Sequence, residues 1–305
     1  MTSLVSTVSR APSPAHRPPA RSHALLPRVA AYAALICGAV GSCALASTPS
    51  AVHQALEAAA HGSWRTRAFV KRDKFRHPVR TLEFFGIRPG MRVVEVLPGG
   101  GWYTEILAPF LRDRGQLIEA TTPVAGTSGW WHRSALHYRA KLAADPAVYG
   151  KVRLEPFELP EYLHLGPPDS ADMVVTFLNM HDLMFANVRG EVTDMVLMKF
   201  LRNAYQVLKP GGVLGIVAHR CNPDMPLSKC FKLARVPQPF LIREAGKAGF
   251  QFGASSEISA NPKDPRAVPV FYFPPTLSPE SGDPAHYHAL GEADNMTLRF
   301  IKPAS

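Results

Sequence analysis

Residues 93–107 read VVEVLPGGGWYTEIL, and they are the most informative stretch of the chain. A short apolar run ends in Gly99, Gly100 and Gly101, and a segment with helical apolar spacing follows at once. The pattern predicts a buried strand, a tight glycine turn and the start of a helix. Such a turn directs backbone N–H groups and the positive end of the helix dipole towards the tip of the strand. We therefore expect a ligand with an anionic group or a ribose at this turn.

Apolar runs and amphipathic segments alternate along the rest of the 305-residue chain. Strand and helix are expected to alternate five times with short connections, which predicts a doubly wound α/β sheet. Ligands bind such sheets at the carboxyl ends of their strands. The expected strands are 91–97, 116–121, 152–154, 171–178, 213–218, 250–254 and 296–301, and the main expected helices are 51–60, 79–85, 102–112, 134–144, 192–208 and 240–249.

The glycine turn differs from two common nucleotide-binding motifs. A dinucleotide-binding turn has a third glycine where the helix packs on the sheet, and Thr104 stands at that position here. No Lys-Ser or Lys-Thr pair follows the glycines, so the turn is not a P-loop. Two features remain: an acidic residue, Glu95, inside the strand before the turn, and the sequence Leu-Lys-Pro-Gly-Gly at 208–212 before a later strand.

Together these two features resemble the class I methyltransferases that use S-adenosylmethionine. The resemblance implies a mostly parallel, Rossmann-like sheet with an antiparallel last strand, and S-adenosylmethionine as the cofactor. More narrowly, the chain resembles a little-characterised bacterial family of methyltransferase-like proteins whose members often carry export signals. This narrower resemblance covers residues 72–303, and the segments that carry it are 84–91, 98–105, 211–215, 256–264 and 291–298.

The resemblance implies which residues hold the amino-acid end of the cofactor. It places Gly99, Gly100 and Gly101 against that end, with Glu95 beneath them. Leu97 stands where the motif commonly has its first glycine, which is a departure from the family pattern.

The resemblance also implies an acidic residue at the end of the second strand that binds the ribose hydroxyls. Glu119 is the candidate here, although Thr121 is equally well placed. Asn179 follows the fourth strand and is expected to contact the cofactor.

Several residues near the strand ends are candidates for the acceptor side of the crevice. His181 could be a general base, because the unperturbed pKa of imidazole lies near neutrality, or it could be structural. His219 and Arg220 close the fifth strand, and Arg220 could bind an anionic substrate or a carboxylate of the crevice. Trp102 and Tyr103 could line the pocket or pack on the sheet.

The stretch 255–290 is rich in proline and is expected to be a loop region. Long loops in compact domains tend to be functional or mobile, so Asn261 and Lys263 are further crevice candidates. No metal site is predicted, because His286-Tyr287-His288 lacks a third ligand.

The amino-terminal residues 1–46 are expected to be a disordered leader and a secretory signal. A basic leader without acidic residues is followed by an apolar stretch and by Ala44-Leu45-Ala46, which fits a cleavage site. Cys43 also fits a lipoprotein signal, which would anchor the protein in a membrane. An uncleaved anchor helix and a mitochondrial transit peptide remain alternatives. We expect an exported, periplasmic protein with a helical segment at 47–80 and a methyltransferase domain at 81–303.

The formal charge of +10 does not by itself indicate a nucleic-acid partner. The basic residues are scattered among acidic ones, apart from the leader and a cluster at 65–80, which favours a solvated basic face. Within that cluster, Asp73 could form an internal ion pair. Only Cys221 and Cys230 would survive cleavage of the signal, and they could pair in an oxidising compartment or remain reduced.

The sequence favours an S-adenosylmethionine-dependent methyltransferase that acts on a small molecule. An exported methyltransferase-like binding protein without transfer activity is the alternative, because the cofactor is made in the cytoplasm. An NAD(P)-dependent oxidoreductase is less favoured because of Thr104.

Overall fold

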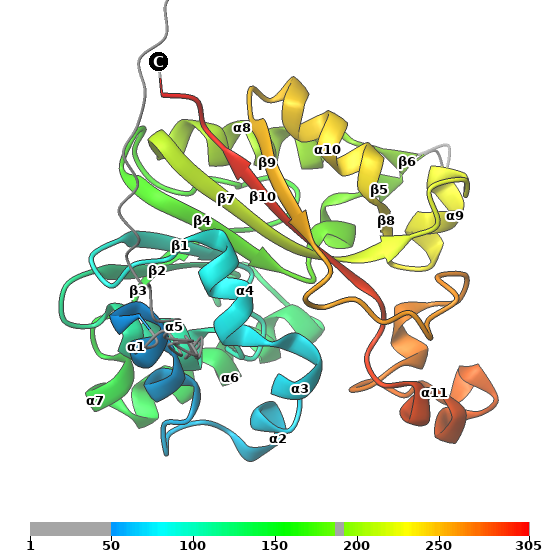
Figure 1. Cartoon of the computed structure of the whole chain (residues 1–305), viewed down its shortest axis with the longest axis horizontal. Helices are drawn as coiled ribbons and strands as arrows, with labels where there is room; N and C mark the ends of the chain where they lie inside the picture. Colours follow the sequence, from blue (N-terminus) through cyan, green and yellow to red (C-terminus); the bar gives the residue numbers. More distant parts are fainter. Residues whose placement is uncertain (1–49, 187–191, 305) are drawn as a thin grey trace, which may run out of the picture. The chain divides into compact units, whose positions relative to one another are not determined.

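The computed structural model of the chain describes residues 50–186 and 192–304 (Figure 1). The described residues belong to one compact unit, 48–305. The predicted export signal, with its cleavage site and Cys43, lies outside the described residues. In the ranges that the structure describes, no helix is both long enough and apolar enough to cross a membrane.

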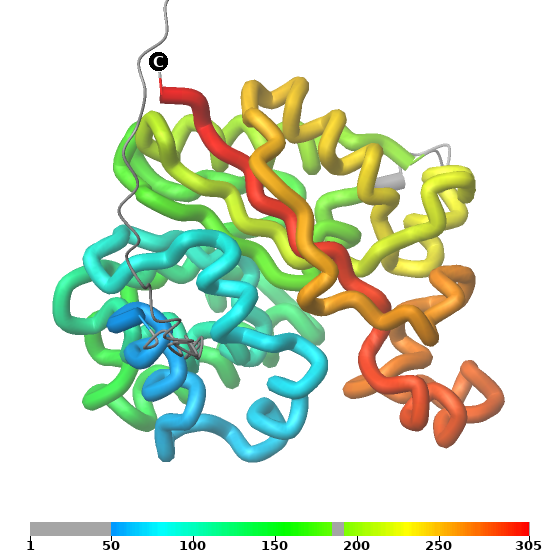
Figure 2. Tube along the Cα trace, in the orientation of Figure 1, coloured from blue at the N-terminus to red at the C-terminus, as the bar shows by residue number. Residues whose placement is uncertain are grey.

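A mostly parallel sheet forms the centre of the unit, in the order β3-β2-β1-β4-β7-β10-β9. Strands β3, β2, β1, β4 and β7 are mutually parallel, and β10 runs antiparallel to both β7 and β9. Figure 2 shows this last strand, in red, between two strands that precede it in the chain. The predicted Rossmann-like sheet with an antiparallel last strand is therefore confirmed. The strands are β1 Arg92–Val96, β2 Gln116–Thr121, β3 Arg153–Pro156, β4 Ala171–Phe177, β5 Phe185–Ala186, β6 Val192–Thr193, β7 Leu208–Cys221, β8 Val236–Pro237, β9 Gln251–Ser256 and β10 Asn295–Ile301.

Helices cover both faces of the sheet (Figure 1). Alternation along the strands separates two cores: Val93 and Val175 pack with α1, α4 and α5, whereas Val94 and Val174 pack with α8 and α10. The helices of 47–80 contribute to the first of these cores through α1 and α4. The longer helices are α1 Ala51–Ala60, α4 Pro78–Phe85, α5 Thr104–Leu111, α6 Gly129–Ala144, α8 Met195–Val207 and α10 Gln238–Lys247. The short ones are α2 Arg67–Val70, α3 Asp73–Arg76, α7 Pro146–Tyr149, α9 Leu227–Lys232, α11 Pro284–Leu290, η1 Met180–Leu183, η2 Val270–Tyr272 and η3 Pro279–Ser281.

Two element boundaries differ from the sequence prediction in ways that affect the crevice. Helix α6 starts at Gly129 rather than at 134, so that Trp130 and Trp131 lie in its first turn. The Lys-Pro-Gly-Gly turn falls inside β7: Leu208 pairs with Ala171 and Val213 pairs with Met173, and residues 209–212 bulge out between them.

Three arginines of the basic cluster at 65–80 are paired inside the unit, whereas its other basic residues are exposed: Arg67, Lys71, Lys74 and Arg80. Arg65 is buried and pairs with Asp73 at 3.1 Å and with the fully buried Glu105 at 3.1 Å, so the proposed internal pair of Asp73 exists. Arg72 and Arg76 both pair with Glu292, which lies more than two hundred positions along the chain. These ion pairs connect the amino-terminal helices to the rest of the unit. Because the three arginines are paired internally, their charge is not available to a partner.

Candidate active site

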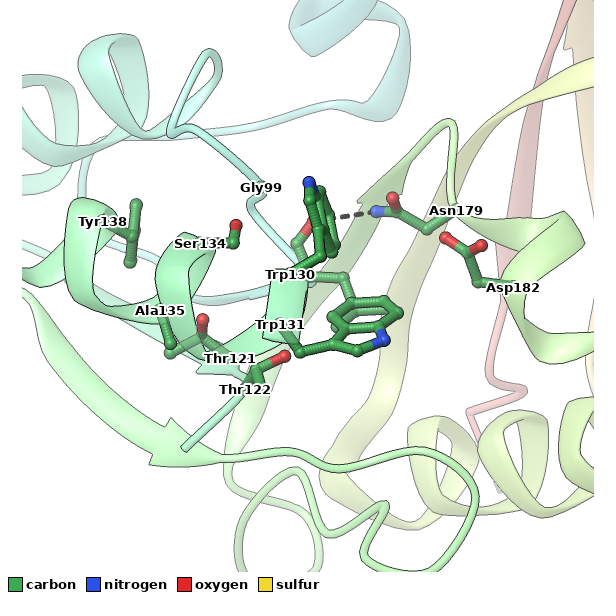
Figure 3. A pocket seen from close by; sticks show the side chains of 11 residues that line it. Gly99, Thr121, Thr122, Trp130, Trp131, Ser134, Ala135, Tyr138, Asn179 and Asp182 are labelled. Carbon is green, nitrogen blue, oxygen red and sulfur yellow. Dashed lines mark hydrogen bonds between the residues drawn. The ribbon is translucent and has the colours of Figure 1, made fainter. Parts of the chain in front are cut away.

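The carboxyl ends of β1, β2 and β4 meet the first turns of α6 at a small cavity of about 70 Å³ (Figure 3). It lies at the strand ends, where the sheet topology predicts ligand binding. In Figure 3 the indoles of Trp130 and Trp131 stand between Asn179 and Asp182 on one side and Ser134 on the other. The lining residues are Leu97, Gly99, Thr121, Thr122, Trp130, Trp131, Ser134, Ala135, Tyr138, Asn179 and Asp182.

The three glycines of the turn have different surroundings. Gly99 has φ +59°, and a β-carbon added there would meet no atom within 4 Å, so its backbone faces open space. A β-carbon at Gly100 would lie 3.4 Å from Phe69, and one at Gly101, where φ is +81°, would lie 3.0 Å from Tyr138 of α6. Gly99 therefore faces the cavity, whereas Gly100 and Gly101 pack against neighbouring side chains.

Leu97 adopts the backbone conformation that usually selects glycine, with φ +54°. The side-chain amide of Asn179 donates to the carbonyl oxygens of Val96 at 3.1 Å and Leu97 at 2.9 Å. These bonds join the end of β4 to the turn that follows β1 and hold the strained residue in place. Asn179 lines the cavity, but its amide N–H groups are already used by the backbone.

A buried polar cluster lies directly below the glycine turn. Glu95 and Glu119 are opposite each other in the β1–β2 register, and both are buried. The Thr104 hydroxyl donates to Glu95 at 3.1 Å and lies 3.1 Å from the hydroxyl of Tyr138. Thr104 thus replaces the third glycine of a dinucleotide motif with a hydroxyl that is bound to the strand acid.

The position of Glu119 corrects its predicted role at the ribose. Its side chain is fully buried and lines neither of the two cavities of the crevice. Leu117, Glu119 and Thr121 share one face of β2, but Glu119 lies two residues before the strand end and is enclosed below the turn beside Glu95, whereas Thr121, the last residue of the strand, reaches the crevice. Thr121 and Thr122 are the residues next to β2 that reach the cavity.

The pKa values of both buried carboxyl groups are raised. Burial raises the pKa of Glu95 from 4.5 to about 7, and burial and the adjacent Glu95 raise the pKa of Glu119. Between the ordinary pKa of 4.5 and the raised pKa of about 7, the folded chain binds more protons at Glu95 than the unfolded chain does. The stabilisation from these protonated carboxyl groups is therefore complete at acidic pH and is lost as the pH rises.

We expect the free energy of unfolding to fall by about 2–3 kcal/mol between about pH 5 and pH 8. The double variant Glu95→Gln/Glu119→Gln should lose most of this fall, because amides do not titrate. Denaturant unfolding at several pH values measures the pH dependence of the unchanged protein and of the double variant. Glu161→Gln, at an exposed position, is the matched control. A double variant with the same pH dependence as the unchanged protein would contradict this explanation.

A second, larger cavity of about 590 Å³ adjoins the first. The two share Leu97, Thr122, Trp131 and Asp182. One side of the larger cavity lies next to the ends of β2 and β3, and the other lies next to η1, α9 and η2. Its other lining residues are Gly126, Thr127, Ser128, Glu158, Leu159, His181, Met184, Phe231, Lys232, Ala234 and Phe271.

His181, a predicted crevice residue, lines the larger cavity. Burial lowers its pKa, and the adjacent Asp182 opposes this only in part. The ring of His219 lies behind it, with centroids 5.6 Å apart, and its Nδ1 is 2.7 Å from Oδ1 of Asn295. Burial also lowers the pKa of His219, well below its usual value. Both imidazoles are therefore neutral at neutral pH.

Three other predicted crevice residues line neither cavity: Trp102, Tyr103 and Arg220. Tyr103 stacks on Phe177 of β4, and Trp102 donates to the carbonyl oxygen of Phe69 in α2, so Tyr103 packs on the sheet and Trp102 packs against the amino-terminal helices. The guanidinium of Arg220 binds Glu257 at 2.8 Å, which makes it an internal partner rather than a substrate ligand.

Asn261 and Lys263 also lie outside the two cavities. The Asn261 amide donates to the carbonyl oxygens of Leu290 and Glu292, which fixes the Pro-rich region instead of contacting a ligand. Lys263 lines a separate surface pocket beside Lys74.

Sequence reasoning missed Trp130, Trp131, Thr122 and Asp182 as cavity residues. The tryptophan pair was visible in the sequence, but it was expected to precede the helix rather than to begin it. Both indoles are exposed, 61% for Trp130 and 43% for Trp131, which is unusual for such large apolar side chains outside a binding site.

Solved structures resemble the chain over most of its length. The [4+2]-cyclase SpnF is 16% identical with a TM-score of 0.54, and the match covers 83% of this chain and 93% of that one. A putative sarcosine dimethylglycine methyltransferase from Galdieria sulphuraria is 11% identical with a TM-score of 0.50, covering 75% and 84%. The chain has the class I methyltransferase fold. Neither the protein-family models nor the curated proteins gave a match.

Proposed function

We propose that the protein is an S-adenosylmethionine-dependent methyltransferase that acts on a small molecule. The observation that carries the proposal is the open turn at Gly99, which lines the smaller of two adjoining cavities at the carboxyl ends of the strands. The class I methyltransferase fold and the acid Glu95 below the turn support it.

The residues around the turn fit the cofactor. The open backbone at Gly99 suits the amino-acid end, and the hydroxyls of Thr121 and Thr122 are available to ribose hydroxyls. The small cavity of about 70 Å³ is below the size of typical ligand sites, so a bound cofactor must extend into the larger one. When bound, S-adenosylmethionine supplies an electrophilic methyl group.

The protein's own contribution to the transfer is chiefly positioning. Attack on a sulfonium methyl group is in line, so a crevice that fixes both reactants can remove much of the barrier. The side of the larger cavity formed by Met184, Phe231 and Phe271 is where we place the acceptor.

Two alternatives remain for the same crevice. SpnF, which shares the fold, is described as a cyclase, so the fold does not by itself decide the reaction. A binding protein without transfer activity would bind the cofactor and leave its methyl group in place. An oxidoreductase would bind NAD(P), and the Thr104–Glu95 hydrogen bond stands against this reading.

Thermal unfolding with added ligands separates these functions. Saturating S-adenosylhomocysteine should raise the midpoint, because a ligand at 100 times its Kd stabilises the folded state by about 2.7 kcal/mol. NAD and NADP should leave the midpoint unchanged. Stabilisation by NADP alone would reject the proposal, and binding of the labelled cofactor without methyl transfer to any acceptor would favour the binding protein.

We also propose that the protein is exported. Cys221 and Cys230 form a disulfide, with Cα atoms 5.8 Å apart, and such bonds persist mainly in oxidising compartments. The bond joins the end of β7 to α9, which carries Phe231 and Lys232 at the larger cavity.

Replacing both cysteines with serine is expected to lower the free energy of unfolding by about 2–3 kcal/mol, because the bond restricts the unfolded chain. Denaturation with and without reductant measures this, and reductant should affect only the unchanged protein. Intact mass of protein from its native cells tests the export proposal, since two free thiols in the mature protein would contradict it.

A further inference from the structure

The outward side of helix α6 is both basic and apolar. Residues 120–144, which include the whole helix, contain no acidic residue. Trp130, Arg133 and His137 are spaced three and four positions apart, so they share one side of the helix, and Trp130 and Arg133 are fully accessible to solvent there. Leu136, which is 47% exposed, adjoins them. The surface that α6 presents to solvent therefore combines cations with large apolar groups.

Helix α2 extends this surface. Nζ of Lys141 in α6 lies over the ring of Phe69 in α2, 4.7 Å from its centroid, so the two helices are neighbours. Arg67 and Val70 of α2 and Lys71, which follows it, are exposed. We define the α2–α6 face by its exposed basic and apolar residues: Arg67, Val70, Lys71, Trp130, Arg133 and Leu136.

The basic side chains of the α2–α6 face have no partner inside the protein. Among the residues that the structure describes, nothing forms an ion pair or a hydrogen bond with the side chains of Arg67, Lys71 or Arg133. They differ in this from Arg72 and Arg76, which pair with Glu292 nearby in the same amino-terminal segment. Three unpaired cations on a surface without acidic neighbours on α6 attract an anionic partner.

The apolar side chains of the same two helices are unusually exposed. Of the eight large apolar side chains that are exposed in the described ranges, four belong to α2 and α6: Val70, Trp130, Trp131 and Leu136. The crevice accounts for the two tryptophans, but Val70 and Leu136 line neither of its cavities. Apolar groups gathered on one surface in this way indicate an interaction site.

We propose that the α2–α6 face docks on a lipid bilayer with anionic headgroups. Lys and Arg side chains bind the negatively charged surface of such a bilayer, while Trp and aliphatic side chains insert at the boundary of headgroups and acyl chains. Trp130 also lines the smaller cavity, so docking brings the rim of the crevice to the headgroup layer (Figure 3). This inference goes beyond the proposed function and does not depend on it.

The apolar groups favour a bilayer over a nucleic acid. A nucleic-acid surface would also attract Arg67, Lys71 and Arg133, because its phosphates are anionic. It offers no apolar layer for Val70 and Leu136, whereas a bilayer accommodates the cations and the apolar groups together.

The test measures the tryptophan fluorescence of the full chain with vesicles whose acyl chains are brominated, because bromine quenches an indole that inserts among them. The leader 1–46 contains no tryptophan, and Trp64 and Trp102 are partly and fully buried, so the signal reports on Trp130 and Trp131. Equimolar phosphatidylglycerol and phosphatidylcholine should quench the fluorescence, and phosphatidylcholine alone should not. The variant Trp130→Phe/Trp131→Phe should lose this quenching.

A charge variant tests the basic side chains. Arg67→Gln/Lys71→Gln/Arg133→Gln should raise the lipid concentration for half-maximal quenching by about 100-fold, since each of the three cations adds to the attraction of the anionic surface. The matched control removes the same charge at three exposed positions on other elements: Arg114→Gln/Arg153→Gln/Arg202→Gln. It should behave like the unchanged protein.

The remaining outcomes would overturn the proposal. These are an unchanged protein that anionic vesicles do not quench, equal quenching by neutral vesicles, and an equal loss in the charge variant and its control. Binding to a DNA duplex without binding to anionic vesicles would assign the face to nucleic acid instead. Equal unfolding temperatures of both triple variants and the unchanged protein show that the substitutions leave the fold intact.

Discussion

Replacing Gly99 with aspartate is expected to weaken S-adenosylhomocysteine binding by about 100-fold, or about 3 kcal/mol. The position faces open space, so the added carboxylate would stand over the turn rather than displace the fold. There it would occupy room needed by the amino-acid end of the cofactor and compete with the cofactor's carboxylate for the backbone N–H groups of the turn. Titration calorimetry of both proteins measures the difference.

A matched control exists for the backbone cost of this substitution. Gly282 has φ +73° and also faces open space, but it lies in the loop after η3, away from both cavities. Gly282→Asp should lose a similar, small amount of stability and keep full affinity. Equal affinities of Gly99→Asp and the unchanged protein would mean that the cofactor does not lie over this turn.

Replacing Asp264 with asparagine is expected to lower the free energy of unfolding by about 3 kcal/mol or more. Arg235 is fully buried, and its Nη1 lies 2.8 Å from Asp264. The same carboxylate oxygen, Oδ2, also accepts the backbone N–H of Asp294 at 2.7 Å. Without the carboxylate, the guanidinium is left as an unpaired buried charge. Denaturant unfolding measures the loss.

The neighbouring Lys263 provides the control for this prediction. Lys263→Ala should leave both stability and activity unchanged, because the Lys263 side chain lies at the surface, outside both cavities. Arg235 also donates to the carbonyl oxygen of Arg220 and follows Ala234, a wall residue of the larger cavity. An Asp264→Asn variant as stable as the unchanged protein would show that the Arg235–Asp264 ion pair does not stabilise the wall of the larger cavity at Ala234.

The sheet could be predicted from the sequence because its signals are local. Buried strands, the glycine turn and the Lys-Pro-Gly-Gly bulge each occupy a short segment, and their order fixes the topology. The crevice followed from the same topology, since Gly99, Asn179 and His181 all follow strand ends.

Other features depend on contacts that no local pattern encodes. Glu119 is near the end of its strand, yet its side chain is buried below the turn, opposite Glu95 on the neighbouring strand. Arg76 reads as part of a basic surface until the fold brings Glu292 to it. Asn261 reads as a loop residue, but its amide binds backbone carbonyl groups of a distant segment. These residues required the tertiary structure because their partners are far away in sequence.

Titration of the unchanged protein with S-adenosylhomocysteine in a calorimeter tests the central claim most directly. We predict saturable heat for one site per chain and a matching rise in the unfolding temperature. A folded protein that gives no heat and no change in unfolding temperature at millimolar ligand would contradict the assignment of the crevice to S-adenosylmethionine.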